Sequence, residues 1–348
     1  MSVIAQAGAK GRQLHKFGGS SLADAKCYLR VAGIMKEYSQ AGDMMVVSAA
    51  GSTTNQLISW LKLSQSDRLA AHQVQQSLRR YHTELIGGLL EPAAADTLIA
   101  AFIHDLERLA GLLDGGVSEA VYAEVVGHGE VWSARLMAAV LNQLGMEAAW
   151  LDARAFLRAE RAAQPQVDEG LSYPLLQQLM AQHPNKRLVV TGFISRNQAG
   201  ETVLLGRNGS DYSATQIGAL AGASRVTIWS DVAGVYSADP RKVKTPACCR
   251  CCVWTKPASW RAWPRRCSMP ARYSRFPPVI SICSYAAATR RNRVPRALSA
   301  CWPPVPAHGL SPAMTTSAWW SSRCRPVTIS NWRIKSWTLC SNAPSCAR

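Results

Sequence analysis

The sequence predicts an α/β fold in which helices cover both faces of a mostly parallel central sheet. Two observations point to it. Short apolar runs typical of buried strands alternate with longer segments whose apolar residues recur every three or four positions. The segment 1–245 is also long enough for one sizeable α/β domain with a substantial core. In such folds ligands bind at the carboxyl ends of the strands, so the residues that follow each strand indicate the function.

The expected elements alternate along the first part of the chain. The apolar lead-in at 14–17 is expected to form the first strand, and a helical pattern covers 23–40. A buried strand follows at 44–48 and stops at the small and polar residues 49–55. Two long segments are helical in composition, 66–113 and 119–144, the second interrupted at Gly127-His128-Gly129. The remaining strands are expected at 147–151, 187–191, 202–205 and 225–229.

The composition changes near residue 245. Residues 1–245 hold 23 Lys and Arg against 22 Asp and Glu, whereas residues 246–348 hold 16 Lys and Arg, no acidic residue and 10 of the 11 cysteines. The formal net charge of +17 therefore belongs almost entirely to this second segment. Soluble domains carry about 25% charged residues of both signs, and neither helix nor strand periodicity organises the segment. We expect it to be irregular or disordered.

Three interpretations of this basic, Cys-, Pro- and Trp-rich tail compete. It is a nucleic-acid or membrane arm, a metal site on Cys248-Cys249-Arg250-Cys251-Cys252, or a stretch translated in the wrong frame. A zinc site usually needs a second ligand pair at a fixed distance, and His308 is the only histidine of the tail.

The frame hypothesis can be examined by back-translation. When residues 248–263 are written with GC-rich codons and read from one base earlier, the product is Leu-Leu-Pro-Leu-Leu-Arg-Leu-Asp-Glu-Ala-Ser-Glu-Leu-Ala-Arg-Leu. Acidic residues return and apolar residues fall at helical spacing. The codons are assumed, but the result favours a tail that is out of frame and non-native.

The most informative motif lies at the end of the first expected strand. Lys16-Phe17-Gly18-Gly19-Ser20-Ser21 combines a cation, two glycines and two hydroxyls before a helical pattern. Glycines let backbone N–H groups approach a polyphosphate, and the following helix start favours anions. The lysine precedes the glycines, so the motif is neither a Walker loop nor a dinucleotide fingerprint. It predicts a phosphate cradle with its own cation.

Four further polar clusters lie at strand or helix ends. Three of them also have a plainer interpretation, as a helix cap or a turn, whereas the stretch 230–241 is too rich in special residues for a plain connection. The clusters are Ser48 with Thr54 and Asn55, the stretch Gly127 to Glu130 with an acid at an expected helix start, the stretch Gly206 to Ala214, and the stretch Ser230 to Arg241. The third offers a guanidinium fork suited to a carboxylate, with a carboxylate nearby.

Together these motifs, from about residue 14 to residue 244, resemble the aspartokinases of the amino-acid-kinase fold, most nearly the kinase half of the bifunctional aspartokinase/homoserine dehydrogenases. The resemblance implies an αβα sandwich that transfers the γ-phosphate of ATP to the side-chain carboxylate of L-aspartate, with Mg²⁺ bridging the phosphates. The product, 4-phospho-L-aspartate, feeds lysine, methionine and threonine synthesis. Homo-oligomers are usual in the family. A shifted-frame segment, Leu-His-Ala-Arg-Thr-Leu-Gln-Pro, also resembles a later motif of the family.

The resemblance also implies roles for particular residues, while no protein metal ligand is expected. Asn208 occupies a position where the family commonly has glycine. A residue at this position must therefore tolerate the left-handed conformation, as asparagine does. The implied catalytic residues are Lys16 and Asp211; the substrate-binding residues are Ser48, Thr54, Glu130, Arg207 and Ser210; and the ATP-binding residues are Lys16, Gly18, Gly19, Ser20, Ser230, Asp231, Tyr236 and Arg241.

The expected organisation is an N-terminal extension at 1–13, a kinase catalytic domain at 14–245 that lacks its C-terminal part, and the tail at 246–348. Weak or absent activity is expected of the chain as it stands. No targeting or membrane-spanning pattern is visible, and Cys27 is the one cysteine before the tail. We therefore expect a cytoplasmic protein that binds L-aspartate and ATP, and neither nucleic acid nor membrane. The alternatives are another enzyme of the amino-acid-kinase fold, and a protein that binds nucleic acid through its tail.

Overall fold

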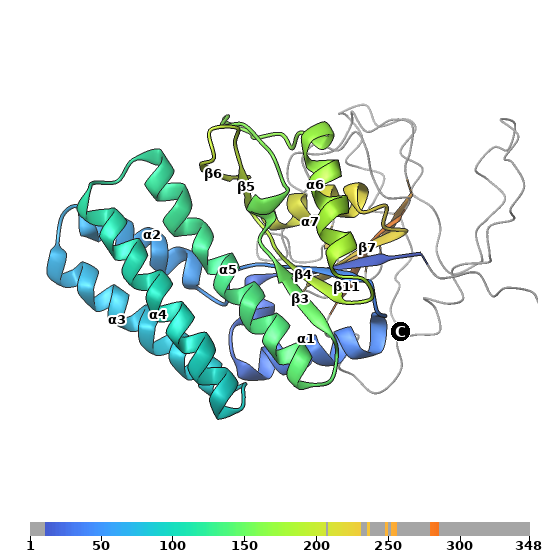
Figure 1. Cartoon of the computed structure of the whole chain (residues 1–348), viewed down its shortest axis with the longest axis horizontal. Helices are drawn as coiled ribbons and strands as arrows, with labels where there is room; N and C mark the ends of the chain where they lie inside the picture. Colours follow the sequence, from blue (N-terminus) through green and yellow to red (C-terminus); the bar gives the residue numbers. More distant parts are fainter. Residues whose placement is uncertain are drawn as a thin grey trace, which may run out of the picture.

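The centre of the fold is a mostly parallel sheet (Figure 1). The computed structural model describes residues 11–206, 208–230, 235–236, 248–249, 252–255 and 279–284. In this part of the chain seven strands pair in the order β10-β11-β7-β1-β2-β4-β3, and only β10 and β11 run antiparallel to each other. The strands are β1 (Gln13–Phe17), β2 (Met44–Val47), β3 (Ala148–Leu151), β4 (Arg187–Thr191), β7 (Arg225–Ser230), β10 (Cys252–Thr255) and β11 (Val279–Ser284).

The strand β1 lies in the middle of this sheet, between β2 and β7. Its side chains alternate between the two faces, as the pleat requires. Leu14 belongs to one buried apolar cluster and Phe17 to the other. Lys16 pairs in register with Val46 and Ile228, both of which belong to the cluster of Leu14. The lysine therefore leaves the sheet on that face, at the carboxyl end of the central strand.

Helices cover both faces, as the sequence predicts (Figure 1). The apolar cluster on the face of Leu14 includes buried side chains of α6 (Glu169–Gln182) and α7 (Gly209–Leu220). The cluster on the opposite face includes buried side chains of α1 (Ala25–Tyr38) and α5 (Glu119–Gln143). The αβα sandwich expected from the resemblance is thus confirmed.

A further group of helices lies beside α5, on the left of Figure 1. It consists of α2 (Thr53–Ser64), α3 (Arg68–Gly87) and α4 (Pro92–Asp114). The single helical segment expected at 66–113 is divided because Gly88 ends α3 and Pro92 begins α4, a position at which proline costs no hydrogen bond. Among the described residues, no helix combines the length and the hydropathy needed to cross a bilayer.

The interruption expected within α5 is wrong. The helix runs unbroken through Gly127-His128-Gly129, and Glu130 lies in its middle instead of at a helix start. A Cβ on Gly127 would lie 2.6 Å from Cγ2 of Ile194, and one on Gly129 would lie 2.8 Å from the Cβ of Ala49. The glycines therefore allow close packing against neighbouring segments, a requirement that outweighs their weak helix propensity.

The polar segment 49–55 follows β2, and α2 begins within it at Thr53. One further difference concerns a strand. The strand expected at 202–205 exists as β6 (Thr202–Leu204), but it pairs with β5 (Ile194–Arg196) in a separate hairpin outside the central sheet.

Short strands also occur within 246–348, the segment expected to be irregular. The strand β9 (Cys248–Cys249) pairs with β8 (Val235–Tyr236), and β10 and β11 extend the central sheet beyond β7. In β11 the sequence Val279-Ile280-Ser281-Ile282 carries the β-branched residues that strands favour. The other residues of that segment, and residues 1–10 of the expected N-terminal extension, lie outside the described part of the chain.

Candidate active site

The site is built around an ion pair between the central strand and the first turn of α7. Nζ of Lys16 lies 2.5 Å from Oδ1 of Asp211, and the two side chains are 11% and 19% exposed. The residues are far apart in the sequence, but β1 and α7 pack directly on each other. Asp211 also lies in the first turn of its helix, where a negative charge is stabilised by the helix dipole. The two residues predicted to be catalytic are thus brought together.

The glycine-rich turn after β1 leads into a single 3₁₀ turn, η1 (Gly19–Leu22), while α1 begins later and is capped by Asp24. A helix was expected to follow the glycine-rich turn directly, but the 3₁₀ turn η1 takes that position. A Cβ on Gly19 would lie 2.7 Å from the carbonyl oxygen of Ala49, so no other residue fits there without a shift of backbone. A Cβ on Gly18 would lie 3.7 Å from Nζ of Lys16. The cradle and its cation are adjacent, as predicted, and Ser20 is exposed beside them.

Glu130 is buried in the middle of α5. Within the described residues its Oε2 atom has no hydrogen-bond partner. Burial raises the pKa of this carboxyl to about 8, although hydrogen bonds from the backbone N–H groups of Ala49 and of Glu130 itself, and the charge of Lys16, act in the opposite direction. A buried carboxyl with an unused oxygen is prepared for a cationic or hydrogen-bonding ligand group.

The loop before α7 has the geometry that its sequence requires. Asn208 adopts the left-handed conformation, with φ of 59° and ψ of 28°, which confirms that it can replace the glycine common in the family. Ser210 packs on Gly192, whose added Cβ would lie 2.8 Å from the Cβ of the serine. Arg207, the expected carboxylate clamp, lies outside the described residues.

Four of the other predicted residues lie in the described part of the chain, in different segments. Ser48 follows β2 directly, its backbone N–H donating to the carbonyl of Phe17 at 3.1 Å, and Thr54 lies in the first turn of α2. Both side chains are half-buried. Ser230 is the last residue of β7 and Tyr236 lies in β8, but only their backbones are described. Asp231 and Arg241 lie outside the described residues, so the nucleotide-binding roles of this stretch remain predictions.

Sequence reasoning missed an ion network that connects α5 to the β5–β6 hairpin. Arg154 bonds Glu124 at 2.7 Å and Asp152 at 2.6 Å, and the hydroxyl of Thr202 donates to Glu124 at 2.5 Å. Burial acts to raise the pKa of Glu124, but Arg154 and Thr202 outweigh it and lower the pKa to about 2. The network fixes the hairpin against the helix that carries Glu130. Since Glu124, Arg154 and Thr202 are distant in the sequence, no local pattern could have revealed their contacts.

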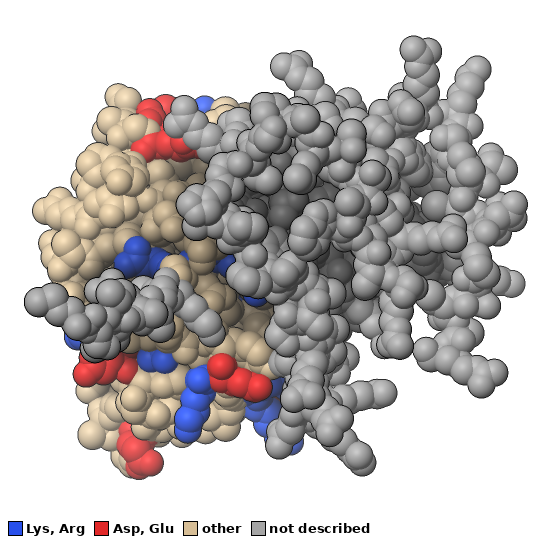
Figure 2. Space-filling model, turned by 90° about the vertical axis from the view of Figure 1, so that its right-hand side faces the viewer, with Lys and Arg blue, Asp and Glu red and all other residues tan. Residues whose placement is uncertain are grey.

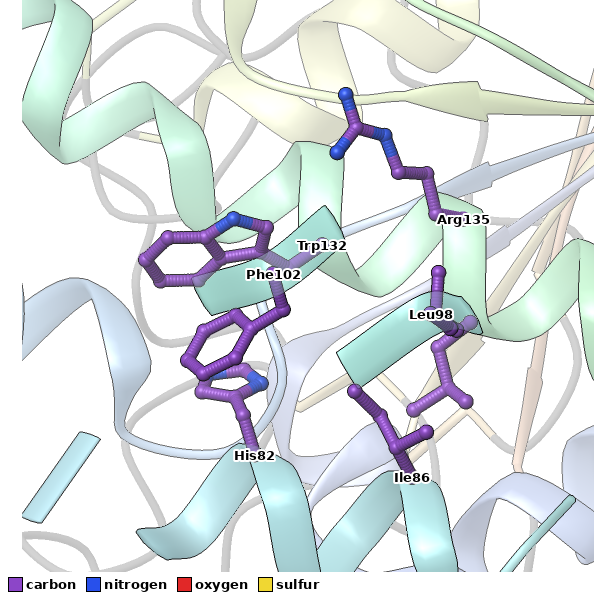
Figure 3. Close-up of a pocket in the computed structure, with 7 residues that line it drawn as sticks. His82, Ile86, Leu98, Phe102, Trp132 and Arg135 are labelled. Carbon is purple, nitrogen blue, oxygen red and sulfur yellow. The ribbon is translucent and has the colours of Figure 1, made fainter. Parts of the chain in front are cut away.

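The described residues also show surface charge and a small pocket away from this site. On the face shown in Figure 2, both Lys and Arg atoms and Asp and Glu atoms are visible among the described residues. No group of three or more possible metal-ligating side chains occurs among the described residues. A small pocket between α3, α4 and α5 (Figure 3) contains no residue predicted for the site. Its lining comprises His82, Ile86, Leu98, Phe102, Trp132, Arg135 and Leu136.

The lysine and the glycine-rich turn at the end of the central strand lie next to a carboxylate of α7. This is the arrangement of an α/β protein with a site suited to an anionic ligand at the carboxyl edge of its sheet. The chain belongs to the amino acid kinase family, whose sequence model matches residues 11–247. This confirms the resemblance on which the site assignments rest.

Two relatives show which members of this family the chain is similar to. The bifunctional aspartokinase/homoserine dehydrogenase 2 of Escherichia coli (strain K12) is 86% identical over 244 residues, which are 70% of this chain and 30% of that protein. Lysine-sensitive aspartokinase 3 of the same organism is 32% identical over 231 residues, 66% of this chain and 51% of that protein. The chain thus spans between about a third and a half of the length of these relatives.

Among solved structures, E. coli aspartokinase III in complex with aspartate and ADP is similar with a TM-score of 0.61 and 28% identity, over 68% of this chain and 52% of that one. The aspartate kinase of Clostridium acetobutylicum has a TM-score of 0.53 and 25% identity, over 67% of this chain and 51% of that one.

Proposed function

We propose that residues 14–245 form the catalytic domain of an aspartate kinase, which transfers the γ-phosphoryl group of ATP to the side-chain carboxylate of L-aspartate and produces 4-phospho-L-aspartate. The observation that carries the proposal is the Lys16–Asp211 pair beside the glycine-rich turn of β1, in a chain 86% identical to an aspartokinase over 244 residues. Aspartate and ADP are the ligands named for the similar E. coli aspartokinase III structure.

In this phosphoryl transfer the protein mainly positions the substrates and stabilises negative charge. An oxygen of the aspartate carboxylate forms a bond to the γ-phosphorus, the bond from that phosphorus to the bridging oxygen breaks, and ADP leaves with the electron pair. A carboxylate is already ionised near pH 7, so no general base is needed. Lys16 neutralises charge on the transferring group, and Asp211 orients the ammonium of Lys16.

Substrate recognition then falls to residues around this pair. Glu130, with its unused buried oxygen, would bind the α-ammonium of aspartate, and Arg207 would clamp the α-carboxylate. Ser48, Thr54 and Ser210 would line the same pocket. The glycine-rich turn would receive the phosphates, with Ser230, Asp231, Tyr236 and Arg241 forming the nucleotide-binding loop.

Mg²⁺ fits this arrangement as an ion carried by the nucleotide. Because Mg²⁺ keeps several waters and binds substrate phosphates through one or two carboxylates at most, it does not require the three-residue cage that the described residues lack. When bound it would neutralise phosphate charge.

The wider assignments depend on the relatives. We propose that the protein is cytoplasmic, forms a homo-oligomer and acts in lysine, methionine and threonine synthesis. We also propose that the natural gene product carries a homoserine dehydrogenase.

We further propose that residues 246–348 are a translation in the wrong frame. The family model ends at residue 247, next to the change in composition. Sequencing the coding DNA across codons 240 to 280 tests this, since a lost or extra base near codon 245 would support it and an intact frame would overturn it.

The function is tested by trapping the acyl phosphate. Hydroxylamine converts 4-phospho-L-aspartate into a hydroxamate, which gives a coloured ferric complex. We expect aspartate-dependent hydroxamate formation that requires ATP and is about 10²- to 10³-fold slower in Lys16→Met. Weak turnover is expected of the chain with its present tail, so the assay is paired with calorimetric binding of aspartate. Binding or phosphorylation of glutamate with no response to aspartate would instead indicate another member of the family.

A further inference from the structure

Two adjacent residues of α3 contact the two loops that build the candidate site. The hydroxyl of Tyr81 donates to the carbonyl of Ala23, directly after η1, at 3.0 Å. The same hydroxyl lies 3.0 Å from the position that a Cβ on Gly51 would occupy. The ring of His82 lies next to the other loop, with its Nε2 atom 3.1 Å from Oγ1 of Thr53. One helix outside the sandwich therefore contacts both strand-end loops.

The direction of these hydrogen bonds follows from counting protons. Oγ1 of Thr53 lies 2.6 Å from the carbonyl oxygen of Ala50 and has one proton to donate. Since the carbonyl can only accept, the hydroxyl donates to it, and the bond to His82 must then be donated by Nε2–H of the imidazole. This assigns the tautomer of His82 and defines a chain from His82 through Thr53 to Ala50.

Ala50 lies in the middle of the loop that the site depends on. The residue before it, Ala49, donates its backbone N–H to the buried carboxyl of Glu130. The residue after it, Gly51, donates its backbone N–H to the carbonyl of Gly19 at 3.0 Å, which ties the loop to the phosphate cradle. The carbonyl of Ala50, which accepts from Thr53, therefore lies between two contacts of the loop. Ala49 contacts the carboxyl of Glu130, and Gly51 contacts the glycine-rich turn.

The surroundings of His82 keep its imidazole ring packed and uncharged. The ring is 2% exposed and packs against Phe102 and Trp132, with centroid distances of 4.9 and 5.1 Å (Figure 3). Burial lowers the pKa of His82 to about 3, so the imidazole stays neutral near pH 7. A neutral, caged imidazole has no role as a proton carrier at that pH, but it can serve as a fixed hydrogen-bond donor.

We propose that Tyr81 and His82 are positioning residues that hold the loop 49–53 against the glycine-rich turn, so that the carboxyl of Glu130 and the cradle keep the spacing that aspartate and the phosphates require. The effect on substrate rests on the proposed function, whereas the effect on the loop does not. The inference therefore has one test that is free of any ligand and one that uses aspartate.

The first test is hydrogen–deuterium exchange of the full chain without ligand. His82→Leu removes the donor, His82→Gln places an amide N–H at a similar reach, and His72→Leu changes an exposed histidine of the same helix. We expect the amide of Gly51 to exchange about tenfold faster in His82→Leu, corresponding to the loss of about one buried hydrogen bond. Amides of β4 should be unchanged, as should the loop in the other two variants.

The second test is calorimetric titration of aspartate with Mg²⁺ and ADP present. His82→Leu is expected to bind aspartate about tenfold more weakly, and His82→Gln within about twofold of the unmodified chain. Unchanged exchange at Gly51, or exchange that accelerates equally throughout the sheet, would overturn the inference. If the unmodified chain did not bind aspartate while the exchange results held, the proposed function would fail and the positioning role would stand.

Discussion

Replacing Glu130 by Gln is expected to stabilise the folded chain at alkaline pH while weakening its binding of a cationic group. Burial raises the pKa of Glu130 from 4.5 to about 8. Between these values the folded chain binds more protons than the unfolded chain, so its free energy of unfolding falls as the pH rises through this window. The full shift corresponds to about 5 kcal/mol. Because Gln does not titrate, the variant escapes this loss.

Urea unfolding, followed by tryptophan fluorescence, measures the effect. The difference in free energy of unfolding between Glu130→Gln and the unmodified chain should be small near pH 5 and reach about 3 kcal/mol or more near pH 8. Other titrating groups cancel in this difference. Glu37→Gln, at an exposed carboxyl of α1, is the matched control and should show no such trend. A difference for Glu130→Gln that does not change with pH would mean that Glu130 does not have a raised pKa in the folded chain.

Three further predictions follow from the geometry. Lys16→Met should lower the rate of hydroxamate formation by about 10²- to 10³-fold with little change in aspartate affinity; equal losses in both would contradict the assigned role. Gly19→Ala should cost about 1–3 kcal/mol in urea unfolding, because the new Cβ meets backbone at 2.7 Å, whereas Gly33→Ala, where that space is open, should cost nothing. Arg154→Met should lower the free energy of unfolding by about 3 kcal/mol near pH 7. The loss should be smaller near pH 4, because without Arg154 the buried Glu124 of the variant can take up a proton; a loss that does not change with pH would count against the network.

Most strands of the central sheet could be predicted from the sequence because they form short apolar runs, whereas β10 and β11 lie in the segment expected to be irregular. The strand at 187–191 was placed at its observed bounds, and those at 44–48 and 225–229 within one residue. Buried parallel strands are nearly continuous apolar runs, which have few alternative structures. The strand-end clusters containing Lys16 and Asp211 could be recognised for the same reason, since polar and glycine residues interrupt such runs where ligands bind.

Features that depend on packing could not be predicted in this way. The glycines of α5 resemble a helix break, and only the positions of Ile194 and Ala49 show why small residues are needed there. The start of α2 at Thr53 consists of turn-forming residues, whereas its helical conformation is supported by the burial of Leu57 on neighbouring helices. The contacts of α3 with the site are likewise invisible in a local pattern.

The most direct test of the account is whether one chain holds aspartate through Glu130 and phosphate through Lys16. Aspartate is titrated calorimetrically into the unmodified chain, Glu130→Gln and Lys16→Met, with Mg²⁺ and ADP present. We expect the unmodified chain to bind aspartate, Glu130→Gln to bind it at least about 30-fold more weakly, and Lys16→Met to retain most of the affinity. Equal aspartate affinity in Glu130→Gln and the unmodified chain would contradict the account.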